Sequence, residues 1–501
     1  MFVKLEAGTP LYPQIYQRLR QAILAGELAA GARLPSSRLL AEEAGVSRNT
    51  VLLAYDQLLA EGYIRGRPGS GTYVASELPD QVPPRRAAGA AEPATPSRAA
   101  RLSRYGAHAL EALGAVHEAD SAPRFDFRYG LPSVQDFPFF VWRKLLMRRL
   151  RRPTLASVNY AHPQGHRPLR AALADYLQRV RAVNCNPERI VVVNGSQQAL
   201  DLISRVLLDP GDRVLIEDPQ YLVARQVLLA GGAKLVPAPV DGEGLVIDRI
   251  PKRARHARLA YVTPSHQFPT GAVMPLSRRL ALLAWAQRNG TYVIEDDYDS
   301  EYRYAGRPIE AVQALDRDGS VIYVGTLSKT MFPSMRVGYL VLPAQLVPAF
   351  VAAKFLADRH TPTLLQEVLA DFIGEGHFER HLRRTRTRNE SRRAALLAAL
   401  RAAFGDGVEV TGSGAGLHML VWLNELPLAR LEELLRHARE DGIGVYPVAP
   451  CYLVPPRRAG LLLGYAALDE AEIRRGIERL GRIVAAMRVP QATRPTGSPK
   501  R

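Results

Sequence analysis

The chain has 501 residues, 47% of them hydrophobic and 23% charged, with a net charge of +17 and only two cysteines, Cys185 and Cys451. This length is too great for one ordinary domain, and the cysteine count argues against a disulfide framework. No apolar run reaches the ~18 residues of a membrane-spanning helix, and the first residues lack a signal-peptide core, so we expect a cytoplasmic protein without membrane contact.

Three predicted helices open the chain. Apolar residues at spacings of four indicate an amphipathic helix over residues 10–25. A second helix begins after the serines at 36 and 37 and closes at Gly45, and a third covers residues 48–61. This order, with polar residues in the first turn of the third helix, is the helix-turn-helix pattern that reads the major groove of double-stranded DNA. The DNA-binding candidates in that turn are Ser47, Arg48, Asn49 and Thr50.

Two short β-strand patterns follow, at residues 63–65 and 71–74, and a Gly/Pro-containing turn joins them. They predict a hairpin wing in which Arg65 and Arg67 contact phosphates. Residues 77–122 are rich in Ala, Pro and Arg and show little periodicity. We therefore expect a flexible linker with one short helix near residues 107–113.

The positive charge indicates a polyanionic partner. Residues 1–75 carry eight Lys or Arg and six Asp or Glu, a net charge of only +2. Most of the excess lies in later clusters, at residues 143–152 and 380–393. Most of these arginines are expected on solvated helix faces. We nevertheless keep the hypothesis that a basic surface of the larger domain contacts the DNA that the small domain holds.

Beyond the linker, apolar strands predict a parallel sheet that is covered on both faces. The strand at residues 190–194 leads into Gly195, Ser196 and Gln197, which open a helix whose free N–H groups can hold a phosphate. Another strand ends at Tyr221. A strand–glycine–helix junction is common and a strand-end tyrosine is often merely packed, so neither signal is specific by itself.

A later strand runs into an acidic and aromatic segment. Asp296 and Tyr298 share one face of the extended chain because they are two residues apart, so Asp297 is expected to point the other way. Pyridoxal 5'-phosphate (PLP) needs a carboxylate on its pyridine nitrogen and a hydroxyl near its phenolic oxygen. Aspartates at strand ends are more often solvated caps or metal ligands, so this assignment depends on a second motif.

The second motif is a lysine just past a β-branched run at residues 320–324. The ε-amine of Lys329 can form a Schiff base with an aldehyde. A nucleotide-binding loop would need a glycine directly before this lysine, where a serine stands. A surface lysine in a turn is the remaining alternative, and the paired carboxylate and hydroxyl upstream favour a PLP site. Neighbouring side chains that can hold the phosphate are Thr326, Ser328 and Arg336.

Two parts of the chain resemble known families. Residues 124–488 resemble the fold-type-I aminotransferases, with residues 295–302 and 328–330 as the specific segments. The first 75 residues resemble the winged-helix domain of GntR-type regulators, on residues 34–39 and 46–50. The fusion is similar to the MocR group of bacterial transcription regulators.

The resemblance implies an α/β protein with a winged helix-turn-helix in front of a PLP-dependent transferase domain of aminotransferase fold type I. A smaller α+β subdomain is expected to begin at about residue 353. The implied boundaries are 1–76 for the winged helix, 77–122 for the linker, 123–488 for the PLP-binding domain and 489–501 for a disordered tail.

The resemblance also implies roles for single residues and for the assembly. Tyr221 corresponds to the aromatic residue that stacks on the cofactor ring, and Arg38, Arg48 and Thr50 correspond to DNA contacts. Some GntR members carry an arginine where this chain has Leu53, so the operator sequence is not implied. The family's arrangement is a homodimer in which one chain's winged helix lies over the other chain's sensor domain.

Two departures from the aminotransferase pattern are visible. The asparagine that bonds the phenolic oxygen is absent from residues 261–271, and either His266 or Gln267 could stand in for it. Residues 460–466 correspond to the late strand that usually carries an arginine for the substrate's α-carboxylate, and they contain none. We therefore predict slow or absent turnover of common amino acids.

Three functions compete for this chain. It is a regulator that senses PLP or an amino-acid or amine effector, a working aminotransferase with an accessory domain, or a vestigial fold that only dimerises. The intact cofactor set argues against the third, and the groove-facing helix argues against the second. The sequence therefore predicts a PLP-dependent, DNA-binding transcription regulator with little or no aminotransferase activity and no metal site.

Overall fold

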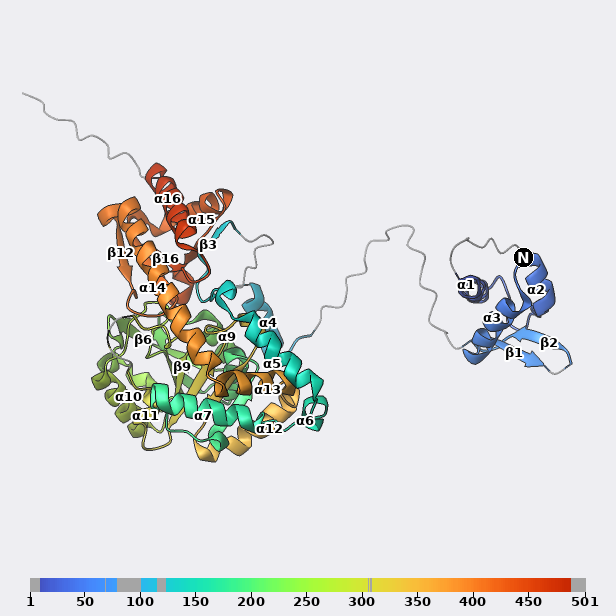
Figure 1. Cartoon of the computed structure of the whole chain (residues 1–501), viewed down its shortest axis with the longest axis horizontal. Helices are drawn as coiled ribbons and strands as arrows, with labels where there is room; N and C mark the ends of the chain where they lie inside the picture. The colour runs from blue at the N-terminus through green and yellow to red at the C-terminus, as the bar shows by residue number, and fades with distance from the viewer. Residues whose placement is uncertain are drawn as a thin grey trace, which may run out of the picture. The chain divides into compact units, whose positions relative to one another are not determined.

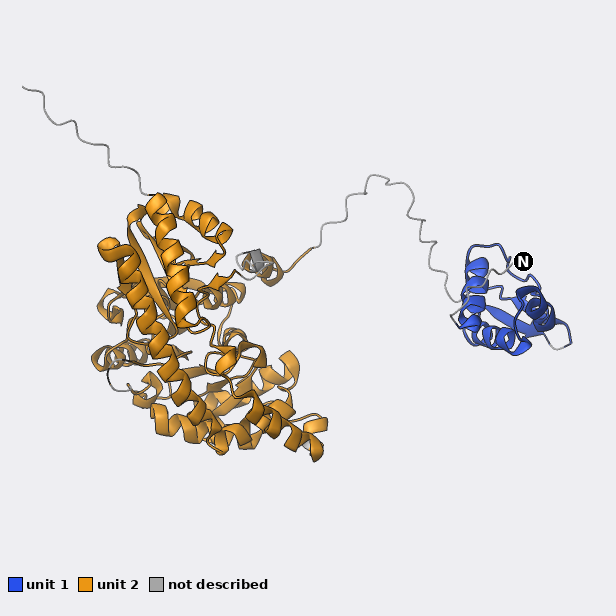
Figure 2. Cartoon of the chain, turned by 45° about the horizontal axis from the view of Figure 1, so that its top comes forward, with its two compact units in different colours: residues 1–100 blue, residues 101–501 orange. Residues whose placement is uncertain are grey.

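The computed structural model describes residues 10–67, 69–78, 101–114, 123–304, 306 and 309–487. The chain forms two compact units, residues 1–100 and 101–501 (Figure 2). The tail predicted at 489–501 and most of the linker predicted at 77–122 lie outside the described residues. Within the described part, none of the helices has the length and apolarity needed to cross a membrane.

Unit 1 contains three helices and a hairpin, in the order expected from the sequence. The Ser36 hydroxyl caps α2 by accepting the N–H of Leu39, and Ser47 caps α3 by accepting that of Thr50. Gly45 ends α2 in the left-handed region, with φ +65°. The elements are α1 (Leu11–Leu24), α2 (Ser37–Ala44), α3 (Arg48–Ala60), β1 (Ile64–Arg67) and β2 (Gly71–Val74).

One apolar core holds unit 1 together. Ile15 and Leu19 of α1, Leu40 of α2, and Val51 and Leu58 of α3 are completely buried. Burial of each such side chain contributes about 1.5–3 kcal/mol. Because these residues take the inner faces of the helices, the first turn of α3 remains at the surface.

An eight-stranded sheet forms the centre of unit 2, in the order β4-β11-β10-β9-β8-β5-β6-β7. All strands run in one direction except β11 and β7. The carboxyl ends of β8, β9 and β10 therefore meet at one edge, where open α/β sheets bind ligands. The strands are β4 (Ile190–Val193), β5 (Arg213–Asp218), β6 (Lys234–Asp241), β7 (Gly244–Leu245), β8 (Leu259–Val262), β9 (Tyr292–Asp297), β10 (Val321–Thr326) and β11 (Gly338–Val341).

Helices cover both faces of this sheet, as the continuous apolar strands predicted (Figure 1). Ile190 and Val192 pack with α5, α7 and α13, whereas Val191 and Val193 pack with α8, α9 and α12. The helices are α5 (Phe139–Arg151), α6 (Leu155–Val158), α7 (Arg167–Arg181), α8 (Ser196–Leu207), α9 (Leu222–Ala230), α10 (Leu276–Asn289), α11 (Val312–Leu315), α12 (Val347–Asp358) and α13 (Thr363–Gly374).

A smaller α+β region completes unit 2. The long helix α14 runs from the helices beside the central sheet to an antiparallel sheet of order β12-β13-β16-β15 (Figure 1). Strand β3, which opens the aminotransferase-like part, pairs with β14 of this region. The elements are β3 (Phe125–Asp126), α14 (His377–Phe404), β12 (Val408–Thr411), β13 (His418–Pro427), α15 (Leu431–Glu440), β14 (Ile443–Gly444), β15 (Tyr446–Pro447), β16 (Arg458–Gly464) and α16 (Glu470–Ala486).

Candidate functional site

Lys329 lies just beyond the carboxyl end of β10, at the edge where the parallel strands end. Its Nζ donates a hydrogen bond to the carbonyl oxygen of Gly130, at 2.8 Å. Burial lowers the pKa of Lys329, and the carboxylates of Asp299 and Asp296 act in the opposite direction. Gly130 has φ +72°, a conformation that favours glycine, and a Cβ there would lie 2.6 Å from Nζ, so a larger residue would displace the amine.

Asp296 is the last residue but one of the neighbouring strand β9 and is 4% exposed. Its Oδ2 accepts a hydrogen bond from the hydroxyl of Tyr261 on β8, at 2.8 Å. Its Oδ1 has no hydrogen-bond partner among the described residues. Burial raises the pKa of Asp296 to about 6, while the bond from Tyr261 opposes that rise. A buried carboxylate with one free oxygen, beside a half-buried lysine, fits a ligand that brings its own protonated nitrogen.

Asp297 points to the opposite face, as predicted. Its carboxylate accepts bonds from the Arg181 guanidinium at 3.0 Å and the Tyr323 hydroxyl at 2.6 Å. This buried pair links β9 to α7 and β10, away from Lys329. The three successive residues Asp296, Asp297 and Tyr298 therefore divide between the site and the core behind it.

Tyr298 turns toward a buried histidine. Its hydroxyl donates to the backbone oxygen of His266 at 2.8 Å and lies 3.0 Å from the Nδ1 of the same residue. That Nδ1 is also 3.1 Å from Oδ2 of Asp299. His418 completes the group, because one ligand atom each from His266, Asp299 and His418 lie within 4.8 Å of one another.

Gln267, the other residue considered for the missing asparagine, makes hydrogen bonds within its own loop and to Pro219. Its amide nitrogen donates to the backbone oxygens of Pro219 and Phe268, at 2.8 and 2.7 Å. Its amide oxygen accepts from the backbone and hydroxyl of Thr270. Of the two candidates, only His266 contacts Tyr298.

Among the residues predicted to hold the phosphate, Arg336 contacts the turn at the amino terminus of α8. Gly195, with φ +85°, turns the chain from β4 into the helix, and a Cβ there would lie 3.0 Å from the Arg336 guanidinium. Arg336 donates to the backbone oxygen of Asn194 at 2.9 Å. The Thr326 hydroxyl accepts the N–H of Ser328 at 3.2 Å. Ser196 is half-buried and Gln197 is exposed.

One acidic residue in this region was not predicted. Asp358, at the end of α12, accepts hydrogen bonds from the side chains of Asn194 and Gln198, at 2.5 and 2.7 Å. It also pairs with the buried Lys354. Asp358 is far from the glycine motif in the sequence, so no local pattern indicated it.

Tyr221 joins a group of rings that we call the aromatic wall. Its ring lies 5.5 Å from that of Phe268, which in turn lies 5.4 Å from Tyr129 and 6.2 Å from Tyr298. The Tyr221 phenol is also within electrostatic reach of Asp296. The wall is assembled from distant segments: Tyr129, Tyr221, Phe268, Tyr298, His418, Trp422, Tyr446 and Tyr452.

The late strand β16 presents leucine to this wall. Leu461 and Leu463 pack into the C-terminal core, whereas the intervening Leu462 packs with the aromatic wall. Arg458 forms an ion pair with Glu409 at 2.6 Å, and its guanidinium lies over the Trp422 ring, 4.7 Å from the centroid. Residues 460–466, which lack the arginine of the aminotransferase pattern, therefore place an apolar side chain, Leu462, against the aromatic wall.

The DNA-binding candidates of unit 1 are at the surface. The four arginines Arg38, Arg48, Arg65 and Arg67 are exposed, as are Ser47 and Asn49, and Thr50 is half-buried. Arg48 donates to the Ser37 hydroxyl at 3.2 Å, which links the first turn of α3 to α2. Arg67 lies over the ring of Tyr73, 4.8 Å from the centroid. The Ser47 hydroxyl is occupied as the helix cap.

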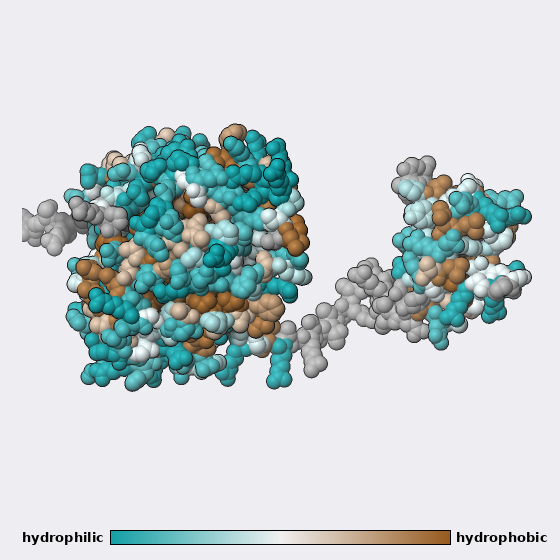
Figure 3. Space-filling view, turned by 60° about the horizontal axis from the view of Figure 1, so that its bottom comes forward, coloured by the Kyte–Doolittle hydropathy of each residue, from teal (hydrophilic) through white to brown (hydrophobic). Residues whose placement is uncertain are grey.

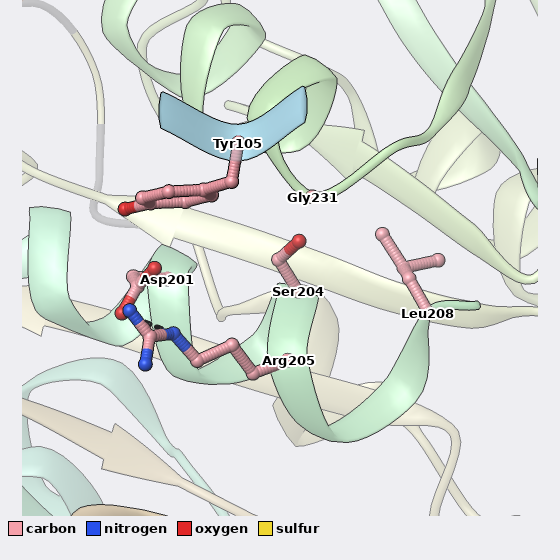
Figure 4. A pocket seen from close by; sticks show the side chains of 6 residues that line it. All are labelled: Tyr105, Asp201, Ser204, Arg205, Leu208 and Gly231. Carbon is pink, nitrogen blue, oxygen red and sulfur yellow. Dashed lines mark ion pairs between the residues drawn. The ribbon is translucent and has the colours of Figure 1, made fainter. Parts of the chain in front are cut away.

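A separate pocket of about 350 Å³ lies within unit 2, between α4 (Arg104–Gly114) and α8 (Figure 4). Tyr105 of α4 faces Asp201, Ser204 and Arg205 of α8 across it, and Arg205 pairs with Asp201 at 2.9 Å (Figure 4). Helix α4 is the short helix predicted within the linker. It belongs to unit 2, packs against α9, and lies close to α8, where the guanidinium of Arg205 is 6.0 Å from the centroid of the Tyr105 ring.

Family comparisons agree with both units. The model for bacterial regulatory proteins of the gntR family matches residues 11–74, and the model for aminotransferase class I and II matches residues 135–480. The chain is 40% identical over 475 residues to a probable rhizopine catabolism regulatory protein, MocR, of Rhizobium meliloti, which covers 95% of this chain and 94% of that one.

More distant relatives have the same two-part character or share the larger part. The HTH-type transcriptional regulator TauR of Rhodobacter capsulatus is 32% identical, over 94% of this chain and 96% of its own. A crystal structure of kynurenine aminotransferase from Pyrococcus horikoshii, in complex with PMP, superposes with a TM-score of 0.68 at 29% identity. That match covers 78% of this chain and 96% of the other.

Proposed function

Because this chain belongs to the gntR family of bacterial transcription regulators, in the MocR type that carries an aminotransferase class I and II domain, we propose that it couples PLP bound at Lys329 to DNA binding by its winged helix. The division at 1–76, 77–122, 123–488 and 489–501 is part of this proposal. So is a cytoplasmic location.

The observation that carries the cofactor assignment is the buried Asp296, whose free Oδ1 lies in the same site as the Lys329 amine. Asp296 would hold the protonated pyridine nitrogen, Tyr298 and His266 the phenolic oxygen, and Tyr221 the ring face. When bound, PLP supplies an aldehyde and an electron-withdrawing ring. The residues that would hold its phosphate are Ser196, Gln197, Thr326, Ser328 and Arg336.

The DNA assignment follows from the exposed first turn of α3. Arg48, Asn49 and Thr50 would enter the major groove and contact base edges. Arg38, Arg65 and Arg67 would contact phosphates around them, which positions the helix without reading sequence. GntR-type domains bind DNA, and the spacing of these donors along one small domain supports the same role here.

We also propose a homodimer with exchanged winged helices as the working form. Aminotransferase-fold relatives are typically dimeric, and unit 2 has hydrophobic patches on its surface (Figure 3). Phe140, Leu155, Val158, Tyr160 and Leu356 are each more than 70% exposed. Monomeric proteins rarely expose large contiguous apolar patches, and a second copy would cover such side chains.

The alternative is an active aminotransferase with an accessory DNA-binding domain. Leu462 stands against it, because an apolar side chain on β16 cannot form the bidentate contact that fixes an amino acid for reaction. We therefore propose little or no turnover, with PLP or an effector acting by favouring one conformation of the dimer.

The cofactor proposal is tested by absorbance and by reduction with borohydride. The purified protein is expected to be yellow, with a band near ~420 nm from lysine-bound PLP. Lys329→Ala should lose both the band and the borohydride-fixed cofactor, whereas Lys234→Ala, at an exposed lysine, should keep both. A colourless wild-type protein that cannot be reconstituted with PLP would overturn the proposal.

DNA binding is tested on a fragment that the wild-type protein selects from a random-sequence pool. Gel shifts of PLP-free and PLP-loaded protein at one salt concentration should give different affinities. Equal affinities in both states would remove the coupling from the proposal. Rapid multiple turnover of an ordinary amino acid with a keto acid would favour the enzyme instead.

A further inference from the structure

The aromatic wall offers half-buried tyrosine faces beside Lys329. Tyr129, Tyr221 and Tyr446 are each partly accessible, and the rings of Tyr129 and Tyr446 meet edge to face at 5.8 Å. Tyrosine faces attract an ammonium group through the ring quadrupole and bind apolar chains by contact. The wall therefore suits a positively charged head with an apolar or hydroxylated body.

Leu462 closes the wall on the side of the second sheet. It is fully buried, and its register partners on the neighbouring strands are Leu420 of β13 and Tyr446 of β15. This whole three-residue row is uncharged. A carboxylate placed here would lose its hydration without gaining a charged partner, which is strongly unfavourable.

Arginines that border the wall are engaged with other groups. Arg128 lies 3.4 Å from the Asp126 carboxylate and donates to the Tyr446 hydroxyl at 3.0 Å. Arg225 donates to the backbone oxygens of Pro450 and Tyr452. Arg458 is paired with Glu409, as described above.

Two carboxylates of the site lie next to Lys329. Asp296 and Asp299 are both almost fully buried and act electrostatically on the lysine. When PLP is bound, Asp296 is paired with the pyridine nitrogen, and the negative charge of Asp299 remains to attract an ammonium group and repel a carboxylate. The electrostatics of the site and the apolar strand thus select in the same direction.

We propose that the effector of this site is a primary amine that carries no α-carboxylate, with its body against the aromatic wall behind which Leu462 packs. This inference rests on the proposed PLP-dependent regulator function, and it names the class of molecule that the regulator senses. It makes Leu462 a specificity-determining residue, because this position decides whether a carboxylate finds a partner.

Matched pairs that differ only by a carboxylate test the inference. PLP-loaded wild-type protein is titrated with tyramine against tyrosine and with ethanolamine against serine. The readouts are affinity for the selected DNA fragment, thermal unfolding midpoint and cofactor absorbance. Each amine should act at a concentration about tenfold or more below that of its amino acid, since a charged group left unpaired costs at least one decade in affinity.

Leu462→Arg should reverse this order by supplying the missing guanidinium, so that each amino acid acts at about tenfold lower concentration than its amine. Leu462→Met is the matched control, because it keeps an apolar side chain of similar volume and should keep the wild-type order. If the arginine variant does not fold, the wild-type panel decides alone.

The outcomes separate this inference from the function on which it rests. Protein that cannot be loaded with PLP, or that binds no DNA, contradicts the proposed function. Loaded, DNA-binding protein that responds to the amino acids as well as to the amines, or that responds to neither class, overturns the inference and leaves the proposed function standing.

Discussion

The two units use arginine for opposite purposes. In unit 1 the candidate arginines, between positions 38 and 67, are exposed and close in sequence. In unit 2, Arg181 is 6% exposed and binds three groups from other segments. An exposed guanidinium remains available to a polyanion, whereas a buried one fixes the neighbouring carboxylate in place. The comparison teaches that burial, rather than residue type, divides arginines that are available to a polyanion from those that hold a carboxylate in the core.

Arg181→Ala should have the largest effect. It leaves Asp297 buried without its partner, and breaking such a pair costs about 3–5 kcal/mol. The free energy of unfolding of unit 2 should fall by that amount, measured by denaturant titration. The unfolding of unit 1 should be unchanged.

Arg179→Ala is the matched control for this experiment. It lies two residues earlier on the same helix, but its side chain is 50% exposed and its pairs with Asp175 and Glu379 are at the surface. Surface pairs contribute about 0–1 kcal/mol. A loss for Arg181→Ala no greater than for Arg179→Ala would show that burial does not separate the two classes.

Arg48→Ala tests the exposed class. The change should weaken binding to the selected DNA fragment by about 1–3 kcal/mol, because a base contact is lost from the first turn of α3. Gel-shift titration at fixed salt measures the change, with Arg179→Ala as the control for loss of charge. Both variants should retain the PLP absorbance band. Unchanged affinity would mean that another helix contacts the bases.

The contrast between local patterns in unit 1 and contacts between distant segments in unit 2 explains how much of the structure the sequence could predict. The helix-turn-helix and wing were predictable because caps, apolar spacing and turn residues all lie within a short segment. Asp296 and Tyr298 were predictable because strand periodicity places them on one face, and the opposite orientation of Asp297 follows from the same rule.

Contacts between distant segments were not predictable in this way. Gly130 meets Lys329 across 199 residues, and no local pattern connects them. The choice between His266 and Gln267 depended on which side chain already makes hydrogen bonds to the backbone. Gln267 donates to the backbone oxygens of Pro219 and Phe268, and only the structure shows these contacts. The sequence placed the missing arginine within residues 460–466, but only the structure shows that Leu462 is the residue of this segment that packs with the aromatic wall.

The buried carboxylate of Asp296 predicts that PLP binding depends on pH. Asp296, with a pKa near 6, must ionise to hold a protonated pyridine nitrogen. PLP affinity should therefore fall as the pH is lowered through about 6. Tyr261→Phe removes the hydrogen bond that favours the carboxylate, so the midpoint should rise toward about pH 7.

Fluorescence titration with PLP between pH 5 and 8 measures both midpoints. Burial also raises the pKa of nearby Glu217, to about 7, so the shift between wild type and Tyr261→Phe is more informative than either curve alone. An unchanged midpoint in the variant would show that a group other than Asp296 controls cofactor binding.

The smallest expected effect distinguishes two exposed arginines of unit 1, one that contacts a phosphate and one that contacts a base. Arg65 lies on the wing strand β1 and is exposed, and a phosphate contact carries no sequence information. Arg65→Ala should weaken binding to the selected fragment and to random DNA by the same factor. It should also reduce the slope of log affinity against log salt by about 1, because one fewer counterion is released.

Arg48→Ala, in contrast, should weaken binding to the selected fragment more than binding to random DNA. Gel shifts of both variants on both DNAs at several salt concentrations measure these differences. A loss for Arg65→Ala that is confined to the selected fragment would place the wing among the base-reading elements.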